Sequence, residues 1–197
     1  MSHGKNFVSL PSGLGGEARK LLDYHQHAVT AIDSLHRLVH DGMVFNATGK
    51  VATLANGATD VFLMSVPAGV YPHMNRATFN FGLGDVDVVT RKDVVTSADG
   101  SVVAAPNTNQ NSSNTAQMVL TSAPTITDAG TVLHTTWATP TATGTGIHTN
   151  TGISGVTPGE EWVMEANTKY SMSITNNSGS TIAYSYDLLF YEVSYVE

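Results

Sequence analysis

The fold class rests on one short stretch near the C-terminus, Lys169-Tyr-Ser-Met-Ser-Ile-Thr175. Its apolar side chains fall at every second position, which is the period of a β-strand with one buried face. The side chains expected on the buried face are Tyr170, Met172 and Ile174. The polar side chains between them are expected on the opposite face. The stretch therefore predicts a strand of an antiparallel sheet that packs on a core.

Short apolar runs of this kind continue from residue 43 to the C-terminus, separated by turn residues every 8–14 positions. The candidate strands are 43–46, 49–55, 60–66, 77–82, 85–90, 101–105, 117–121, 131–138, 161–165, 169–175 and 181–195. In the last run, one face carries Ile182, Tyr184, Tyr186, Leu188 and Phe190. Pairs such as Asn56-Gly57 and Asp99-Gly100 favour hairpin turns. No helix is predicted between these strands, so residues 43–197 are expected to form an antiparallel jelly-roll-like β-sandwich.

Residues 1–42 are predicted to be an appendage made of an extended arm and one α-helix. In the arm, residues 1–14, the apolar side chains are Phe7, Val8 and Leu10. Pro11 and the glycines that follow it disfavour a helix here. An apolar arm of this kind is either disordered or docked on another surface, and we favour docking.

The one helix is predicted over residues 16–40. It begins at Gly16-Glu17, with an acid in the first turn, and ends at Asp41-Gly42. Its apolar residues form a heptad seam interrupted by His25. The side chains that we expect in an interface are Leu21, Ala28, Ile32, Leu35 and Val39. The helix either packs on its own β domain or on another subunit, and the lack of a second predicted helix favours the partner.

The composition restricts the classes of partner. Charged residues make up only 13% of the chain and hydrophobic residues 41%, so Ser, Thr, Asn and Gly are expected to cover the surface. Residues 99–197 carry eight acids and one base, Lys169, which accounts for the net charge of −7. A nucleic-acid interface needs a basic patch, and none is present. Anionic membranes are equally disfavoured as partners.

The chain contains no cysteine, which excludes disulfides, thiolate metal sites and cysteine nucleophiles. The N-terminus lacks the apolar run of a signal peptide, and no stretch reaches the roughly 18 apolar residues of a membrane span. Synthesis in a cytoplasm is therefore expected.

The sequence shows no motif of a known catalytic site. His36 and His40 lie four apart on the predicted helix, a spacing that can hold a metal, but an exposed helix face is favoured. Asp85 and Asp87 share one strand face, where a solvated face is favoured over a calcium site. Glu160-Glu161 is expected to be an exposed turn pair. We assign no catalytic, cofactor-binding or metal-binding residue.

Two polar segments are predicted to be loops that face solvent. Residues 107–115, Asn-Thr-Asn-Gln-Asn-Ser-Ser-Asn-Thr, contain four asparagines and no charge. Residues 139–159 are rich in Thr and Gly and also carry no charge. Exposed aromatic side chains would favour sugar binding, but Trp137 and Trp162 lie in strand-like runs, so both are expected to be buried.

An ordered series of segments resembles small virion proteins of tailed bacteriophages. The series comprises Thr53-Leu-Ala-Asn-Gly-Ala-Thr59, Gly84-Asp-Val-Asp-Val88, Thr96-Ser-Ala-Asp-Gly100, Asn109-Gln-Asn-Ser-Ser-Asn-Thr115, Pro124-Thr-Ile-Thr-Asp-Ala-Gly130, Glu161-Trp-Val-Met-Glu-Ala-Asn-Thr-Lys-Tyr170 and Ile174-Thr-Asn-Asn-Ser-Gly179. The chain is similar to capsid decoration, or cement, proteins over roughly residues 43–192. Residues 1–42 lie outside this resemblance.

The resemblance implies a β-sandwich on the outer capsid surface that bridges subunits of the major capsid protein, commonly as a homotrimer. It implies a virion location, synthesis in the bacterial host cytoplasm and no enzymatic activity. The arm would reach across the shell, and the two polar loops would lie at the far end. A tail or fibre component that binds a receptor or glycan is the second hypothesis. A carbohydrate-active enzyme on a β-sandwich is the third.

Overall fold

The computed structural model describes residues 21–22, 29–30, 34–82, 84–138, 149–153 and 161–193. The chain divides into two compact units between Arg37 and Leu38, and each is described by itself. The structure is mainly β, with antiparallel strands and one short helix, as the alternating sequence pattern predicts.

The long helix predicted over residues 16–40 is wrong in its first part. Strands β1 (Leu21–Leu22) and β2 (Val29–Thr30) form an antiparallel pair, and α1 (Ser34–His40) is only seven residues long. Leu21 lies opposite Thr30 in this pair, so it cannot share a helical seam with Leu35. A single amphipathic helix gains little stability without a packing partner, and the β-branched pair at Val29–Thr30 favours a strand.

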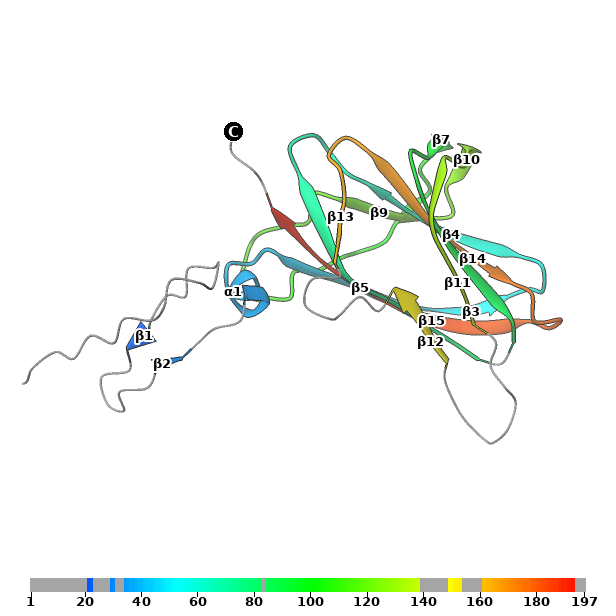
Figure 1. Ribbon diagram of the computed structural model, residues 1–197, viewed down its shortest axis with the longest axis horizontal. Helices are drawn as coiled ribbons and strands as arrows, with labels where there is room; N and C mark the ends of the chain where they lie inside the picture. The colour runs from blue at the N-terminus through cyan, green and yellow to red at the C-terminus, as the bar shows by residue number, and fades with distance from the viewer. Residues whose placement is uncertain are drawn as a thin grey trace, which may run out of the picture. The chain divides into compact units, whose positions relative to one another are not determined.

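Two sheets form the larger unit (Figure 1). In spatial order, the six-stranded sheet consists of β11 (Thr131–Ala138), β6 (Val86–Lys92), β14 (Lys169–Asn176), β4 (Thr59–Ser65), β9 (Val119–Ser122) and β8 (Ser101–Val102). The five-stranded sheet consists of β12 (Thr149–Ile153), β5 (Tyr71–Phe81), β15 (Ile182–Val193) and β3 (Val44–Leu54), with β13 (Trp162–Val163) also paired to β5. A small ribbon of β7 (Val95–Ala98) and β10 (Thr125–Asp128) extends from β6 and β11. The chain passes repeatedly from one sheet to the other, as in a jelly roll.

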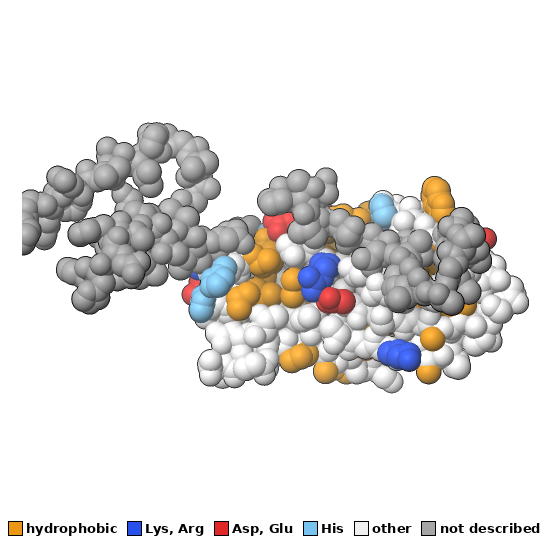
Figure 2. Space-filling model, turned by 90° about the horizontal axis from the view of Figure 1, so that it is seen from below, with side chains coloured by type: hydrophobic (Ala, Val, Ile, Leu, Met, Phe, Trp, Pro, Cys, Tyr) orange, Lys and Arg blue, Asp and Glu red, His pale blue; other side chains and the backbone are white. Residues whose placement is uncertain are grey.

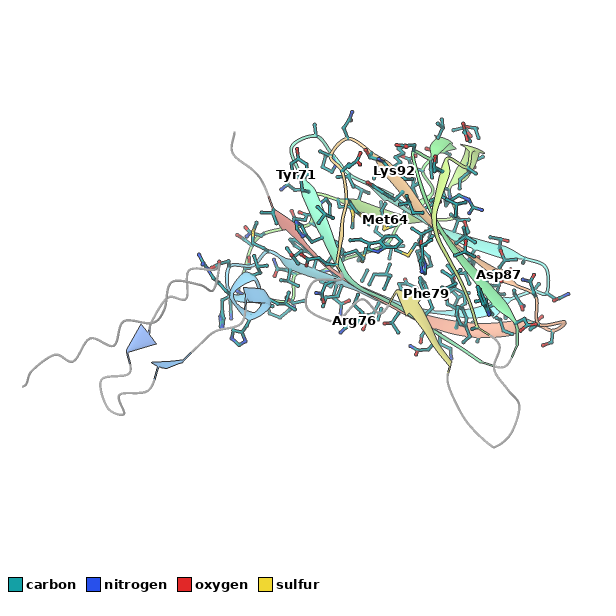
Figure 3. All side chains as sticks on the ribbon, viewed as in Figure 1. Met64, Tyr71, Arg76, Phe79, Asp87 and Lys92 are labelled. Atoms are coloured by element: carbon teal, nitrogen blue, oxygen red, sulfur yellow. The ribbon has the colours of Figure 1, made fainter. Side chains whose placement is uncertain are left out.

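The core lies between the inner faces of the two sheets. The largest fully buried side chains include Phe45, Phe79, Phe190, Met64 and Tyr184, and Figure 3 shows Met64 and Phe79 between the two layers. Full burial of a large apolar side chain contributes about 1.5–3 kcal/mol to the stability of the fold. Burial raises the pKa of the Tyr184 hydroxyl, which donates a hydrogen bond of 3.0 Å to Asp60 Oδ2.

The alternation in the two C-terminal strands is confirmed. On β15, Ile182, Tyr184, Leu188 and Phe190 are buried, and Tyr186 is partly buried. On β14, Tyr170, Met172 and Ile174 belong to the core cluster. Ser171 and Ser173 occupy the other face of β14, as predicted, but they are buried as well.

Besides β1 and β2, three further strands of the structure were not predicted. The short strands β7 and β10 are mostly exposed and carry few apolar residues. Strand β12 lies within residues 139–159, which were predicted to be a projecting loop, and it pairs with β5 from Thr149↔Phe81 to Ile153↔Ala77. Edge strands of this kind are held by backbone hydrogen bonds, which leave no hydrophobic period in the sequence.

The predicted helix end at Asp41-Gly42 is confirmed. Gly42 has φ +69°, the Gly42 N–H donates to the Val39 carbonyl over 3.0 Å, and the Met43 N–H donates to the Leu38 carbonyl over 2.9 Å. These two bonds define a Schellman motif, which satisfies carbonyls that a helix otherwise leaves unpaired.

The asparagine-rich loop, residues 107–115, is exposed or partly exposed along its whole length, as predicted, and it also completes this helix end. Asn109 Nδ2 donates to the His40 carbonyl over 3.0 Å. Asn107 Nδ2 donates to the Gly42 carbonyl over 2.8 Å, and Asn114 Nδ2 donates to the same oxygen over 3.2 Å. The loop therefore ties the end of α1 to the start of β3.

Substitution of Gly42 by Ala is expected to destabilise the protein more than substitution of Gly57 by Ala. Both glycines have positive φ, +69° and +76°, so both variants carry the roughly 1–2 kcal/mol strain of a left-handed residue. A Cβ at Gly42 would also overlap Ser112 Oγ, whereas a Cβ at Gly57 meets nothing within 4 Å. Chemical denaturation should show a further loss of about 1 kcal/mol or more for Gly42→Ala. Equal losses of stability in the two variants would show that Ser112 leaves room for a Cβ at position 42.

Candidate binding surfaces

The outer face of the six-stranded sheet is a regular grid of side chains. One row crosses four strands and consists of Trp137, Asp87, Thr175 and Thr59. A second row consists of Thr135, Val89, Ser173 and Val61. The alternation in β6, where Val86 and Val88 are buried and Asp87 and Val89 are partly exposed, fixes which side chains point outward.

The middle of this face is covered by β7 and the turn that follows it. Lys169 Nζ, on β14, donates to Thr96 Oγ1 over 2.8 Å and to Asp99 Oδ1 over 2.6 Å. The Thr121 hydroxyl, on β9, donates to the Asp99 carbonyl. The turn at Asp99 thus reaches across β4, which lies between β14 and β9. This cover explains why Leu63, on the outer face of β4, is fully buried.

The two edges of the six-stranded sheet, at β11 and at β8 and β9, are not covered in this way. Together with the β7–β10 ribbon, they carry most of the exposed apolar side chains among the described residues. Seven large hydrophobic side chains are exposed among the described residues: Val95, Val102, Val119, Val132, Leu133, Trp137 and Val163. Six of the seven belong to the six-stranded sheet or to the β7–β10 ribbon, and Val163 alone belongs to the five-stranded sheet. We call five of them the exposed aliphatic set: Val95, Val102, Val119, Val132 and Leu133.

The tryptophans differ from each other. The expectation that Trp137 is buried is wrong, because 69% of its surface is exposed on the outer face of β11. Trp162 packs partly against the core, and its ring meets the His134 ring edge-on at a centroid distance of 5.7 Å. Trp137 points outward because its neighbour Ala138 occupies the inward position, and alternation places successive residues on opposite faces.

The five-stranded sheet presents a different outer face, in which polar groups are paired with one another. Arg76 Nη2 and Asp187 Oδ2 lie 2.8 Å apart across β5 and β15. Figure 2 shows this side of the molecule, with a basic and an acidic group together near the middle of the face. Arg76 is labelled in Figure 3, where it lies on the outer side of the sheet.

Glu161, predicted to be part of an exposed turn pair, belongs to a polar cluster on this face. The Tyr191 hydroxyl donates to Glu161 Oε2 over 2.7 Å and lies 3.0 Å from His73 Nδ1. Glu161 Oε1 lies 3.2 Å from the same nitrogen, and the His73 ring stacks on the Tyr191 ring at 4.5 Å. The cluster ties the start of β13 to β5 and β15, which gives it a structural role.

Only part of the predicted interface falls on described side chains. Leu35 and Val39 lie on α1 and are partly exposed. Leu21 lies in β1, and its side chain is outside the described set. Phe7, Val8, Leu10, Ala28 and Ile32 also lie outside the described residues. The predicted interface therefore lies mostly outside the described side chains and stays a prediction.

The structure describes both residue pairs that were considered for metal binding. His36 and His40 are exposed on α1. Asp85 is exposed before β6, and Asp87 Oδ2 accepts a hydrogen bond of 2.8 Å from Asn177 Nδ2. Within the described part of the chain, no group of three His, Asp or Glu side chains is arranged to hold a metal ion.

Within the same part of the chain, no helix has the length and apolar character that a membrane crossing requires. Comparisons with protein-family models, with curated proteins and with solved structures give no match for this chain. Its function is therefore argued from its residues, its fold and the resemblance described above.

The exposure of Trp137 predicts a simple fluorescence result. Acrylamide should quench a large part of the emission of the native protein, and Trp137→Phe should remove most of that quenchable part. The emission of Trp162, which packs against the core, should remain and should be quenched more weakly. Stern–Volmer plots of the two proteins test this, and equal quenching constants would contradict the placement of Trp137.

Proposed function

We propose that this chain is a structural, non-enzymatic virion protein, a capsid decoration protein on the outer surface of a tailed-bacteriophage shell. The observation that carries the proposal is the uneven distribution of exposed aliphatic side chains: among the described residues, five of six belong to the six-stranded sheet or its ribbon. Single exposed valines are ordinary on a protein surface, but exposed apolar side chains that lie close together mark a candidate contact. Val102 and Val119, on the neighbouring strands β8 and β9, form such a group.

The exposed aliphatic set would contact the major capsid protein or a second copy of this chain. Val102, on edge strand β8, is 76% exposed and lies in register with Thr121 of β9. Val119 lies on the same face two residues along β9. Apolar side chains at the centre of an interface are buried when the partner binds, which supplies much of the affinity. A homotrimer that bridges capsid subunits would use contacts of both kinds.

The N-terminal appendage, residues 1–42, would add to this attachment. Its apolar side chains include Phe7, Val8 and Leu10, and Leu35 and Val39 on α1 are partly exposed. The low share of charged residues also suits a protein present in many copies on one particle, because dense like charges would repel one another. We place its synthesis in the bacterial host cytoplasm and propose no nucleic-acid or membrane partner.

A second function, as a receptor- or glycan-binding component of a tail or fibre, is favoured by a different observation. Trp137 presents an exposed aromatic ring on strand β11, and the apolar face of a sugar can pack on such a ring. This proposal differs from the first in the position of the chain on the particle and in its copy number.

The copy number in purified virions separates these two proposals. Quantitative mass spectrometry should give a ratio to the major capsid protein of order one if the chain decorates the shell. A handful of copies per particle would exclude decoration and favour the tail or fibre. Absence from virions would contradict both proposals.

Attachment to the shell should depend on the exposed aliphatic set. Val102→Asp places a charge in the proposed contact and is expected to lower virion occupancy at least tenfold. Its effect on folding should stay within about 0.5 kcal/mol, because the residue is exposed. Ala52→Asp is the matched control, since it adds the same charge at an exposed position of β3 in the other sheet. Equal virion occupancy of the two variants would show that the β8 edge is not part of the contact with the shell.

A further inference from the structure

The row that begins at Trp137 combines an exposed aromatic ring with fixed polar groups. Trp137 stands on β11 directly opposite Asp87 on β6, and Asp87 is followed in the row by Thr175 and Thr59. Directly opposed side chains on neighbouring strands have Cβ atoms about 4.5–5.5 Å apart. Adjacent strands lie about 4.8 Å apart, so the row extends over about 14 Å.

Hydrogen bonds hold the polar members of this row in place. Asp87 Oδ2 accepts a hydrogen bond of 2.8 Å from Asn177 Nδ2, and the hydroxyls of Thr175 and Thr59 are 2.9 Å apart. Asp87 Oδ1 has no partner among the described residues, so this oxygen is available to accept a hydrogen bond from a ligand. Asp87 is labelled in Figure 3.

We propose that this row binds a neutral hexopyranose unit of a glycan. The apolar C–H face of the sugar ring would lie on the Trp137 indole. Ring hydroxyls at the edge of the sugar would donate to Asp87 Oδ1, and hydroxyls further along the glycan would reach Thr175 and Thr59. The sheet fixes the backbone positions of all four residues, and hydrogen bonds hold the three polar side chains in place before binding, so less freedom is lost on binding.

The chemistry of the row favours a sugar over a protein partner. A protein hot spot needs apolar neighbours that exclude water from the central ring. Trp137 lies opposite the Asp87 carboxylate and two residues from the Thr135 hydroxyl, and both groups can form hydrogen bonds. Val89 lies diagonally opposite the ring, and one valine does not enclose it. The nearest members of the exposed aliphatic set, Val132 and Leu133, lie at the other end of β11. A pyranose matches this arrangement, because it has one apolar face and a rim of hydroxyls.

The charges near the row favour a neutral sugar. Asp87 carries the only charged side chain in the row, and Asp85 is exposed two residues before it. The nearest arginine on β6, Arg91, is two rows away and donates to Ser173 Oγ over 3.2 Å. Sialic or uronic acids would bring a second negative charge close to Asp87, which is unfavourable.

This inference goes beyond the decoration role, and it uses the same exposed ring that favours the second proposed function. Sugar binding can be measured on the purified full chain without particles, whereas the position on the particle is measured from copy number. The absence of sugar binding would therefore not contradict the proposed position on the particle, and an unexpected copy number would not contradict sugar binding.

The test is saturation-transfer NMR on the full chain with the methyl glycosides of glucose, galactose, mannose and N-acetylglucosamine. At least one glycoside should show transfer, strongest at the C–H protons of one ring face, with a dissociation constant on the order of millimolar. Trp137→Ala should weaken binding at least about tenfold, and Asp87→Ala at least threefold. Val102→Ala, which trims an exposed side chain at the opposite edge of the same sheet, should leave binding unchanged.

Thermal melting of each variant establishes that it is folded before binding is compared. If none of the four glycosides shows transfer to the native protein, the proposal is wrong. Undiminished transfer to a folded Trp137→Ala variant would also overturn it. If sugar binding is absent and Trp137→Ala lowers virion occupancy, the ring is a protein contact and the sugar site is excluded.

Discussion

The sandwich depends on the burial of two apolar inner faces against each other. Strand β15 has the central place in the five-stranded sheet, because it pairs with both β5 and β3 over most of its length. Its inward side chains meet those of β4 across the core, as in the contact between Tyr186 and Phe62, whose ring centroids lie 4.7 Å apart. Neither sheet could expose this surface to water without losing most of its stability.

Because the inner faces of both sheets form the core, only the outer faces are exposed to solvent, and the side chains on the two outer faces differ. The five-stranded sheet pairs its polar side chains with one another, as in Arg76–Asp187 and the His73–Glu161–Tyr191 cluster. The six-stranded sheet is covered in the middle by the turn at Asp99 and remains open at both edges. The exposed valines of β8 and β9 and the exposed ring of Trp137 on β11 thus lie at opposite edges of one sheet.

The junction between α1 and the sandwich shows how uncharged polar residues contribute to the fold. Three asparagines of the 107–115 loop donate to carbonyls at the end of α1, and Gly42 provides the left-handed turn. A helix-end carbonyl that is removed from water without a hydrogen bond lowers the stability of the fold. Side-chain amides can donate the missing hydrogen bond, so they are well suited to this position. The loop therefore has a structural role that its composition does not reveal.

The sequence by itself determined the β class, the inward faces of β14 and β15 and the end of α1 at Gly42, because each depends on local periodicity or on one residue's backbone preference. The tertiary structure decided the rest. Residues 21–30 contain a strand pair within the region predicted as a helix, since a short amphipathic segment takes the form that its contacts stabilise. The exposure of Trp137 was also out of reach of the sequence. The sequence of a strand shows which side chains share a face, but only the packing of the sheets decides which face is exposed to water. In β11 the small side chain of Ala138 lies in the core and Trp137 lies on the exposed face.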